Sequence, residues 1–322
     1  MGAKQATRPH ARWGYLSGKV ICMHYRPLGK TGFKVSEIGM GCNRLGEPNM
    51  PDEHWVGLVQ QAIELGVNLF DTSESYGWGR SEEMLGRAIG NRADVLIATK
   101  VSRIRETNQH DFSAKRIIAQ AEGSLRRLRR DCIDIYQLHS PSLEEMKRFD
   151  WLDGMARLKQ EGKIRLVGVS INDAASGQWL IEQGLADVLQ VAYNMLEPRV
   201  GEAVFPVAER HGVGIMVRMP MAQGILTGKF RPGEAVPEGH RAHLAGKHMA
   251  ELIQRAEAFK PLAQEWGISL GQIALRYAIS APGVSAAIPG ARSVEQLAMN
   301  VEASNGVGLS PAELQRIASI LG

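Results

Sequence analysis

Four residues carry the side chains best suited to chemistry, and they are Asp71, Tyr76, Lys100 and His139. Three of them end a short apolar run, and Tyr76 follows the first in a turn rich in Gly, Ser and Glu. A tyrosine is a weak acid near neutral pH, but a nearby ammonium group stabilises its phenolate and lowers its pKa. This combination predicts proton donation to a substrate oxygen.

Lys100 is the least ordinary of the four, because a lysine behind five mostly apolar residues is costly to bury unless it is paired. Asp71 on the neighbouring strand is the expected partner, and Lys100 would then lower the pKa of Tyr76. A neutral His139 would hydrogen-bond a carbonyl oxygen and orient it. Each residue alone also has a structural explanation, such as a turn contact or an ordinary buried histidine. None of them can supply a hydride, so reduction would require a cofactor.

Short apolar runs and longer amphipathic stretches alternate along the chain. The apolar runs are nearly continuous, as expected for parallel strands covered on both faces. We predict eight strands, at residues 35–41, 67–72, 94–100, 134–140, 164–170, 187–194, 213–219 and 284–290. We predict helices at residues 52–66, 81–90, 113–128, 151–162, 174–184, 201–212 and 293–303. Together they indicate an α/β fold, a single (β/α)8 TIM barrel, in which the carboxyl ends of the strands form one mouth.

A doubly wound sheet is the competing architecture, but its phosphate-binding fingerprint is missing. GMGCNRLG has Arg44 where the third glycine of GxGxxG belongs, and a P-loop-like GKT has His24 in place of its first glycine. Two connections are long, at residues 102–113 and 219–247, and both lie on the face where barrel loops build sites.

Charge and composition narrow the function further. The net charge is +4, but the first thirty residues hold six Lys and Arg and no acid, which leaves 32 basic against 34 acidic residues in the remainder. With 6% aromatic residues, the body of the chain offers little for nucleic-acid binding. We predict a basic flexible extension at residues 1–24 and a barrel at residues 25–322, ending in a C-terminal capping helix.

The cysteines and the hydropathy of the sequence indicate the cellular compartment of the protein. The three cysteines, Cys22, Cys42 and Cys132, form no CxxC pair, which fits a reducing compartment without disulfides or a structural metal. No apolar run approaches the length of a membrane span, and the N-terminus lacks a signal-peptide core. We therefore expect a cytoplasmic protein with neither a membrane nor a nucleic acid as partner.

The ordered set of motifs resembles the aldo-keto reductase superfamily over about residues 25 to 302. The motifs are FDTSESYGWGRSEE, the lysine after VLIAT, YQLHSP, GVS, LQVAYN, GILTGKF and IPGARSVEQLAMN. This resemblance, to a bacterial-type member with short loops, implies an NADPH-dependent reductase of aldehydes or ketones. It also implies that the four residues form the catalytic tetrad, with Tyr76 as the proton donor.

The resemblance further implies a set of cofactor-binding residues. Ser170 and Gln190 match positions that bind the nicotinamide carboxamide, whereas Asn172 is displaced by one position from the asparagine usual in the family. Arg218 stands where an aromatic residue often stacks on the nicotinamide, and a guanidinium plane can also stack. The other matches are Asp71, Gly41 and Cys42 near the nicotinamide ribose, and Pro220, Gly224 and Lys229 around the pyrophosphate.

The final motif bears on the choice of cofactor. Gly290 to Ser293 precede a helix, whose N-terminus can bind an anion. Arg292 would pair with a 2′-phosphate, while Gln296 and Asn300 would face the adenosine. An N-cap followed by ordinary helix polar residues is the alternative explanation. We predict NADPH over NADH.

Two other functions fit parts of the sequence. The family includes potassium-channel β subunits, so a catalytically weak, regulatory NADP(H)-binding barrel is one alternative. A TIM-barrel isomerase or lyase that uses Lys100 or His139 directly is the other. For a reductase, we expect a small carbonyl or alcohol substrate whose pocket includes Trp78 and the two long connections. Their Arg103, Arg105, His110 and Arg231 indicate either an anionic or polar substrate or ordinary solvated loop charge.

Overall fold

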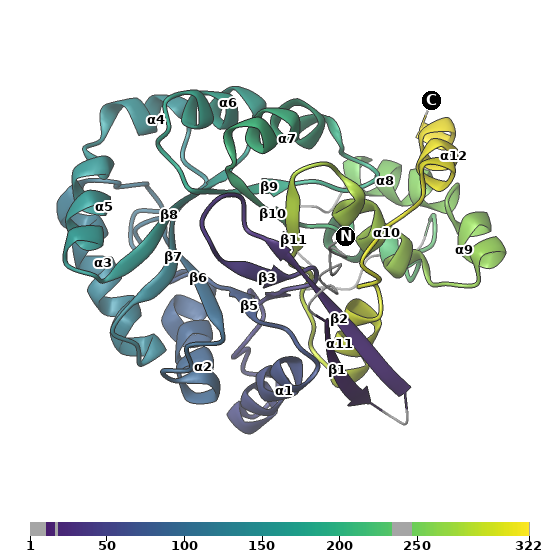
Figure 1. Cartoon of the computed structure of the whole chain (residues 1–322), viewed down its shortest axis with the longest axis horizontal. Helices are drawn as coiled ribbons and strands as arrows, with labels where there is room; N and C mark the ends of the chain where they lie inside the picture. The colour runs from purple at the N-terminus through teal and green to yellow at the C-terminus, as the bar shows by residue number, and fades with distance from the viewer. Residues whose placement is uncertain (1–10, 17–18, 234–246, 322) are drawn as a thin grey trace, which may run out of the picture.

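Eight parallel strands form the central sheet of the protein (Figure 1). The computed structural model describes residues 11–16, 19–233 and 247–321. The strands follow chain order and are β4 (Met40–Gly41), β5 (Leu69–Asp71), β6 (Leu96–Val101), β7 (Ile133–His139), β8 (Ile164–Ile171), β9 (Val188–Ala192), β10 (Gly214–Arg218) and β11 (Val284–Ala287). Parallel bridges Ile38–Ala287 and Gly41–Gly290 join the first strand segment to the last. The sheet therefore closes, which confirms the predicted TIM barrel.

Helices surround the barrel (Figure 1). Those that follow the strands are α1 (Asp52–Glu64), α2 (Arg80–Ile89), α3 (Ala114–Leu128), α5 (Trp151–Gln160), α6 (Ala174–Glu182), α7 (Arg199–His211), α10 (Leu270–Ser280) and α11 (Val294–Val301). Shorter or additional elements are η1 (Tyr76–Gly79), α4 (Leu143–Arg148), η2 (Ala222–Thr227), α8 (Lys247–Glu257), α9 (Lys260–Trp266) and α12 (Pro311–Leu321). The predicted C-terminal capping helix is α12, whose Ile317 packs into the core.

Helices α8 to α10 lie where the sequence predicted no helix, between the seventh and eighth strands. Eight of the eleven residues of α10 are buried, so the helix lacks the polar face from which amphipathic helices are recognised. Its start carries a usable signal, a capping box of Ser269 and Gln272. Part of the long connection predicted at 219–247, residues 234–246, lies outside the described residues.

The barrel interior contains a layer of apolar side chains that repeats with the two-residue period of a strand. This inner cluster includes Leu69, Leu96, Ala98, Ile135, Leu166, Val188, Met216, Ala286 and Ile288. The alternate strand residues, such as Phe70 and Ile97, belong instead to the large cluster between sheet and helices. Side chains thus fill the barrel, and the positions nearer the strands' carboxyl ends are left for other residue types.

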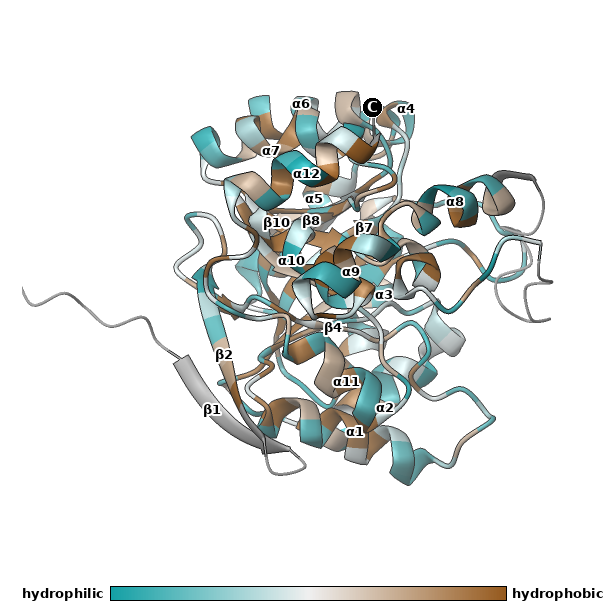
Figure 2. Cartoon of the chain, turned by 90° about the vertical axis from the view of Figure 1, so that its right-hand side faces the viewer, coloured by the Kyte–Doolittle hydropathy of each residue, from teal (hydrophilic) through white to brown (hydrophobic). Residues whose placement is uncertain are grey.

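An N-terminal three-stranded antiparallel sheet precedes the barrel. Its strands are β1 (Ala11–Leu16), β2 (Lys19–Pro27) and β3 (Lys34–Ser36), and Figure 2 shows β2 along one side of the barrel. Leu28 and Val35 join the inner cluster, so this segment closes the barrel bottom. β2 runs through the predicted boundary at residue 24, and Met23 is fully buried. The division at that residue remains a prediction, and residues 1–10 and 17–18 lie outside the described residues.

No helix among the described residues is both long enough and apolar enough to cross a membrane.

Candidate active site

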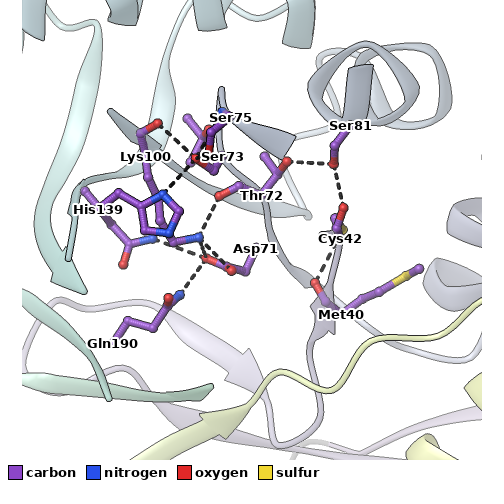
Figure 3. Close-up of polar contacts among 12 residues, drawn as sticks. Met40, Cys42, Asp71, Thr72, Ser73, Ser75, Ser81, Lys100, His139 and Gln190 are labelled. Carbon is purple, nitrogen blue, oxygen red and sulfur yellow. Dashed lines mark hydrogen bonds and ion pairs between the residues drawn. The ribbon is translucent and has the colours of Figure 1, made fainter. Parts of the chain in front are cut away.

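At the carboxyl ends of the strands, the side chains that face the barrel interior are polar, whereas those of the layer below are apolar. Lys100 pairs with Gln137 across β6 and β7, His139 with Ser170 across β7 and β8, and Ser170 with Gln190 across β8 and β9. Each lies an even number of residues beyond an inward-facing apolar side chain of its own strand, so all are expected to face the interior. Strand period and register therefore bring these polar groups together, and Figure 3 shows Lys100, His139 and Gln190 around Asp71.

Lys100 and Asp71 form a buried ion pair, as the sequence predicted. The Lys100 Nζ atom lies 2.8 Å from both Asp71 oxygens and donates to Thr72 O at 2.7 Å. Lys100 is 0% and Asp71 is 4% exposed. Burial alone would lower the pKa of Lys100, but its pairing with the Asp71 carboxylate outweighs burial and raises the pKa above its usual value. Lys100 is therefore a permanent cation in the barrel mouth.

Tyr76 and His139 lie against this cation. The Lys100 Nζ atom is 5.2 Å from the Tyr76 ring centroid, and the Tyr76 and His139 rings meet edge to face at 5.8 Å. His139 Nδ1 lies 3.2 Å from Ser73 Oγ (Figure 3). Burial, followed by the Lys100 and Arg218 charges, holds the pKa of His139 well below its usual value. This low pKa favours the neutral form of the imidazole.

The pKa of Tyr76 differs from the expectation. Lys100 does lower it, but burial acts more strongly in the opposite direction, and the net pKa is raised above the usual value. Tyr76 is therefore firmly protonated in this state of the protein. This favours a proton donor over a proton acceptor.

Two contacts to the tetrad were missed from the sequence. Gln137, fully buried, donates to Asp71 Oδ1 at 3.3 Å, and Ser73 contacts His139. Gln137 sits two residues before His139, so the strand period alone could have identified it as inward-facing. Ser73 is in a turn, where sequence spacing gives no direction for the side chain.

The residues assigned to the nicotinamide also lie at the barrel mouth, but they differ in their hydrogen-bond partners. The Gln190 amide donates to Asp71 Oδ1 at 2.7 Å. Ser170 Oγ is buried without a hydrogen-bond partner among the described residues. Such an orphaned hydroxyl is costly unless a ligand satisfies it, and a carboxamide would fit it. Asn172 is exposed and accepts from Arg218 Nη2 at 2.9 Å, so in this structure its side chain braces Arg218.

Gly41 and Cys42 lie where the first strand meets the last. A Cβ on Gly41 would stand 2.8 Å from Ile288 O, so only glycine fits the close bridge to Gly290. Cys42 is buried, and burial raises the pKa of its thiol. Cys42 is thus an uncharged, packed residue beside Asp71.

The remaining cofactor candidates surround the start of α11. Asn300 donates to Gly290 O at 3.2 Å, and its Oδ1 is buried without a partner in the described part of the chain. Gln296 Oε1 accepts from Arg292 N at 3.0 Å, and both residues are exposed. Burial and then the Arg292 charge lower the pKa of Lys229, which places the two cations near each other.

The two other candidates lie in the segment after β10, where Pro220 is buried and Gly224 adopts a φ of 96°. A Cβ built on Gly224 would lie 3.5 Å from Lys229 Cε. The residues present thus fit a nucleotide with two ends: an unsatisfied hydroxyl at the strand ends, and the exposed Arg292 cation at the start of α11.

The chain matches known proteins over most of its length. A family model described as "Aldo/keto reductase family" matches residues 37–321. A probable voltage-gated potassium channel β subunit of Arabidopsis thaliana is 30% identical, covering 93% of this chain and 97% of its own. An NADH-specific methylglyoxal reductase of Escherichia coli is 28% identical, covering 89% and 95%.

A solved structure shares the fold. The holo form of an aldo-keto reductase from Bacillus halodurans superposes with a TM-score of 0.77 at 30% identity, covering 92% of this chain and 96% of that one.

Proposed function

The chain belongs to the aldo/keto reductase family of NAD(P)H-dependent oxidoreductases acting on C=O and CH–OH groups, and from this premise we propose that it reduces aldehydes or ketones with NADPH. The observation that carries the proposal is the placement of the buried Lys100 cation, held by Asp71 on one side and adjoining the Tyr76 ring on the other. A reductase needs such a proton donor at the barrel mouth.

Bound nicotinamide supplies the hydride. Tyr76 protonates the carbonyl oxygen, and the fixed Lys100 charge stabilises the phenolate that this leaves. Neutral His139 orients the carbonyl by donating a hydrogen bond from Nε2, and Ser73 Oγ, 3.2 Å from Nδ1, fixes the ring. Asp71 keeps Lys100 charged and in place. In the reverse direction the same groups would serve the oxidation of an alcohol.

The preference for NADPH rests on this chain's own residues, because one relative is NADH-specific. Arg292 is exposed at the start of α11, with the Lys229 charge nearby. An exposed arginine at a helix N-terminus suits a 2′-phosphate, which NADPH has and NADH lacks. Gln296 and Asn300 would bind the adenosine. Titration with both nucleotides, followed by tryptophan fluorescence, tests the assignment: tighter binding of NADPH supports it, and equal binding contradicts it.

Compartment is a separate inference. The structure leaves Cys22, Cys42 and Cys132 as free thiols. Unpaired cysteines fit a reducing environment, which supports a cytoplasmic location.

A catalytically weak, NADP(H)-binding regulatory barrel is the second candidate. It is favoured by the near full-length similarity to a probable potassium channel β subunit. NADPH binding without turnover of any carbonyl in a broad panel would support this candidate over the reductase.

A further inference from the structure

A polar pocket of about 760 Å³ lies between the 102–113 segment and the turns that follow β7 and β8. It includes Ser140, the residue after His139, and Asn172, which holds Arg218. Only one of its twelve lining residues, Pro141, lacks a polar side chain. Ligand pockets are usually lined mainly by apolar groups, so this lining indicates a ligand rich in hydrogen-bonding groups.

The charges around the pocket nearly cancel. Arg103 and Arg148 are opposed by Glu144, Glu145 and Asp173. A sixth group, the lining histidine of the 102–113 segment, contacts Glu145 at 3.0 Å, and burial lowers its pKa, so it adds little positive charge near neutrality. No excess of cations is left to attract a phosphate or carboxylate. A neutral ligand therefore fits better than the anionic one suggested by the arginines alone.

We propose that this pocket binds the hydroxyl groups of a neutral, polyhydroxylated carbonyl compound, such as an open-chain ketose. The inference rests on the proposed reductase function and adds its substrate class. Carboxylates, amides and guanidinium groups can each hold hydroxyls at two positions, and the pocket supplies all three. A compound without hydroxyls would leave these groups unsatisfied.

Two ketones with the same four-carbon skeleton test the proposal: erythrulose, which has three hydroxyls, and 2-butanone. Sites built around hydroxyl groups reject analogues without them strongly, so kcat/KM with NADPH should favour erythrulose by about 100-fold or more. Because hydroxyls also activate a carbonyl chemically, the second arm uses Gln109→Leu in the pocket. This change should lower the ratio of kcat/KM for erythrulose to kcat/KM for 2-butanone by about tenfold.

The control is Gln183→Leu, an exposed glutamine that ends α6 at the other end of the barrel. A preference that survives Gln109→Leu intact, or a ratio near one in the wild type, would overturn the pocket's role while the reductase function stands. A higher kcat/KM for dihydroxyacetone phosphate than for dihydroxyacetone would overturn the neutral class. No NADPH binding and no turnover of either ketone would instead remove the reductase function and, with it, this inference.

A second, independent observation concerns a buried carboxylate between the tetrad members. Glu74 is 8% exposed, and its Oε1 accepts from Ser102 N at 2.8 Å. Glu74 stands two residues before Tyr76, and Ser102 stands two residues after Lys100. The Glu74 N–H also donates to Lys100 O at 3.3 Å. These bonds join the segment that carries the phenol to the segment that carries the ammonium.

Ser102 holds one carboxylate oxygen of Glu74, and two residues of α3 lie against the carboxylate. Arg116 lies 3.5 Å from Glu74 Oε1, and the Gln120 amide donates to Glu74 Oε2. The more distant Glu82 and Arg127 charges oppose each other. A buried carboxylate is costly, so its placement at this junction calls for a role.

We infer that Glu74 is a positioning residue of the proposed reaction, which sets the Tyr76 hydroxyl against the Lys100 ammonium through its bond to Ser102. Small displacements in an active site can cost one to two orders of magnitude in rate. Charge is not required for this role, because the neutral amide of glutamine also offers an acceptor oxygen at the same reach.

Two substitutions distinguish the effect of side-chain length from the effect of side-chain charge. Glu74→Gln keeps the length of the side chain and removes its charge, so kcat should stay near the wild-type value. Glu74→Asp keeps the charge but is one methylene shorter, so kcat should fall by about tenfold or more, with KM and the Kd for NADPH unchanged. The reverse pattern, or equal kcat in both variants, would overturn the inference. A Glu74→Asp loss in NADPH affinity rather than kcat would also overturn it.

Discussion

The Lys100 ammonium lies 2.8 Å from each carboxylate oxygen of Asp71, in a barrel mouth where neither residue is more than 4% exposed. Such a pair stabilises weakly as a whole, because burial of both charges offsets their attraction. Its structural consequence is a fixed positive charge, which cannot move away when the neighbouring tyrosine releases its proton.

Breaking this pair is expected to destabilise the protein. Lys100→Met would leave the Asp71 carboxylate buried without its cation, and the free energy of unfolding should fall by about 3–5 kcal/mol. Urea denaturation measures the loss. Lys159→Met, which removes an exposed lysine paired with Asp187, is the control and should cost less than about 1 kcal/mol. Similar small losses in both variants would contradict a buried charge pair.

Arg292 is predicted to discriminate between the two nucleotides. Arg292→Ala should weaken NADPH binding by about tenfold, or 1.4 kcal/mol, because only NADPH has the 2′-phosphate. The Kd for NADH should remain unchanged. Fluorescence titration of both nucleotides measures this, with Arg316→Ala, an exposed arginine paired with Glu265, as the matched control. Equal losses for NADPH and NADH would refute the assignment.

Substitution of Ser170, unlike that of Arg292, should weaken the binding of NADPH and NADH equally. Its hydroxyl is predicted to bind the carboxamide, which both nucleotides share, so Ser170→Ala should weaken both by about 1 kcal/mol. Because the hydroxyl has no partner among the described residues, its removal should leave the melting temperature of the free protein unchanged or slightly raised. A lower melting temperature with normal nucleotide affinities would show that Ser170 serves the fold instead.

Stability should depend on pH through Glu74. Burial raises the pKa of Glu74 to about 7 in the folded protein, against about 4.3 for an unfolded glutamate. The folded state therefore holds the proton more tightly, and this contribution to stability is full below about pH 4 and lost as the pH rises through 7. The loss should be on the order of 3 kcal/mol.

Glu74→Gln provides the comparison, because it cannot titrate. Urea denaturation of both proteins between pH 5 and 8 should give a difference in unfolding free energy that shifts in favour of the variant as the pH rises. A difference independent of pH would mean that Glu74 keeps an ordinary pKa.

The sequence was sufficient for the barrel and the polar groups of its mouth, because strand period and the run-ending positions of Asp71 and Lys100 follow from local pattern. It missed α10, which is buried on most sides and so has no amphipathic period. It also misjudged the balance at Tyr76, where Lys100 lowers the pKa but burial raises it more. Packing sets that balance. The roles of Glu74 and Asn172 likewise depend on contacts between turns, which spacing does not determine.

The most direct test of the account is turnover of NADPH-loaded enzyme with erythrulose, compared between wild type and Tyr76→Phe. Nicotinamide absorbance and the product alcohol would be measured together, with the Kd for NADPH as the control for binding. The wild type should convert one ketone per NADPH oxidised, and the variant should lose about 100-fold or more in rate at unchanged Kd. Equal rates in the two proteins would contradict the assignment of Tyr76 as the proton donor.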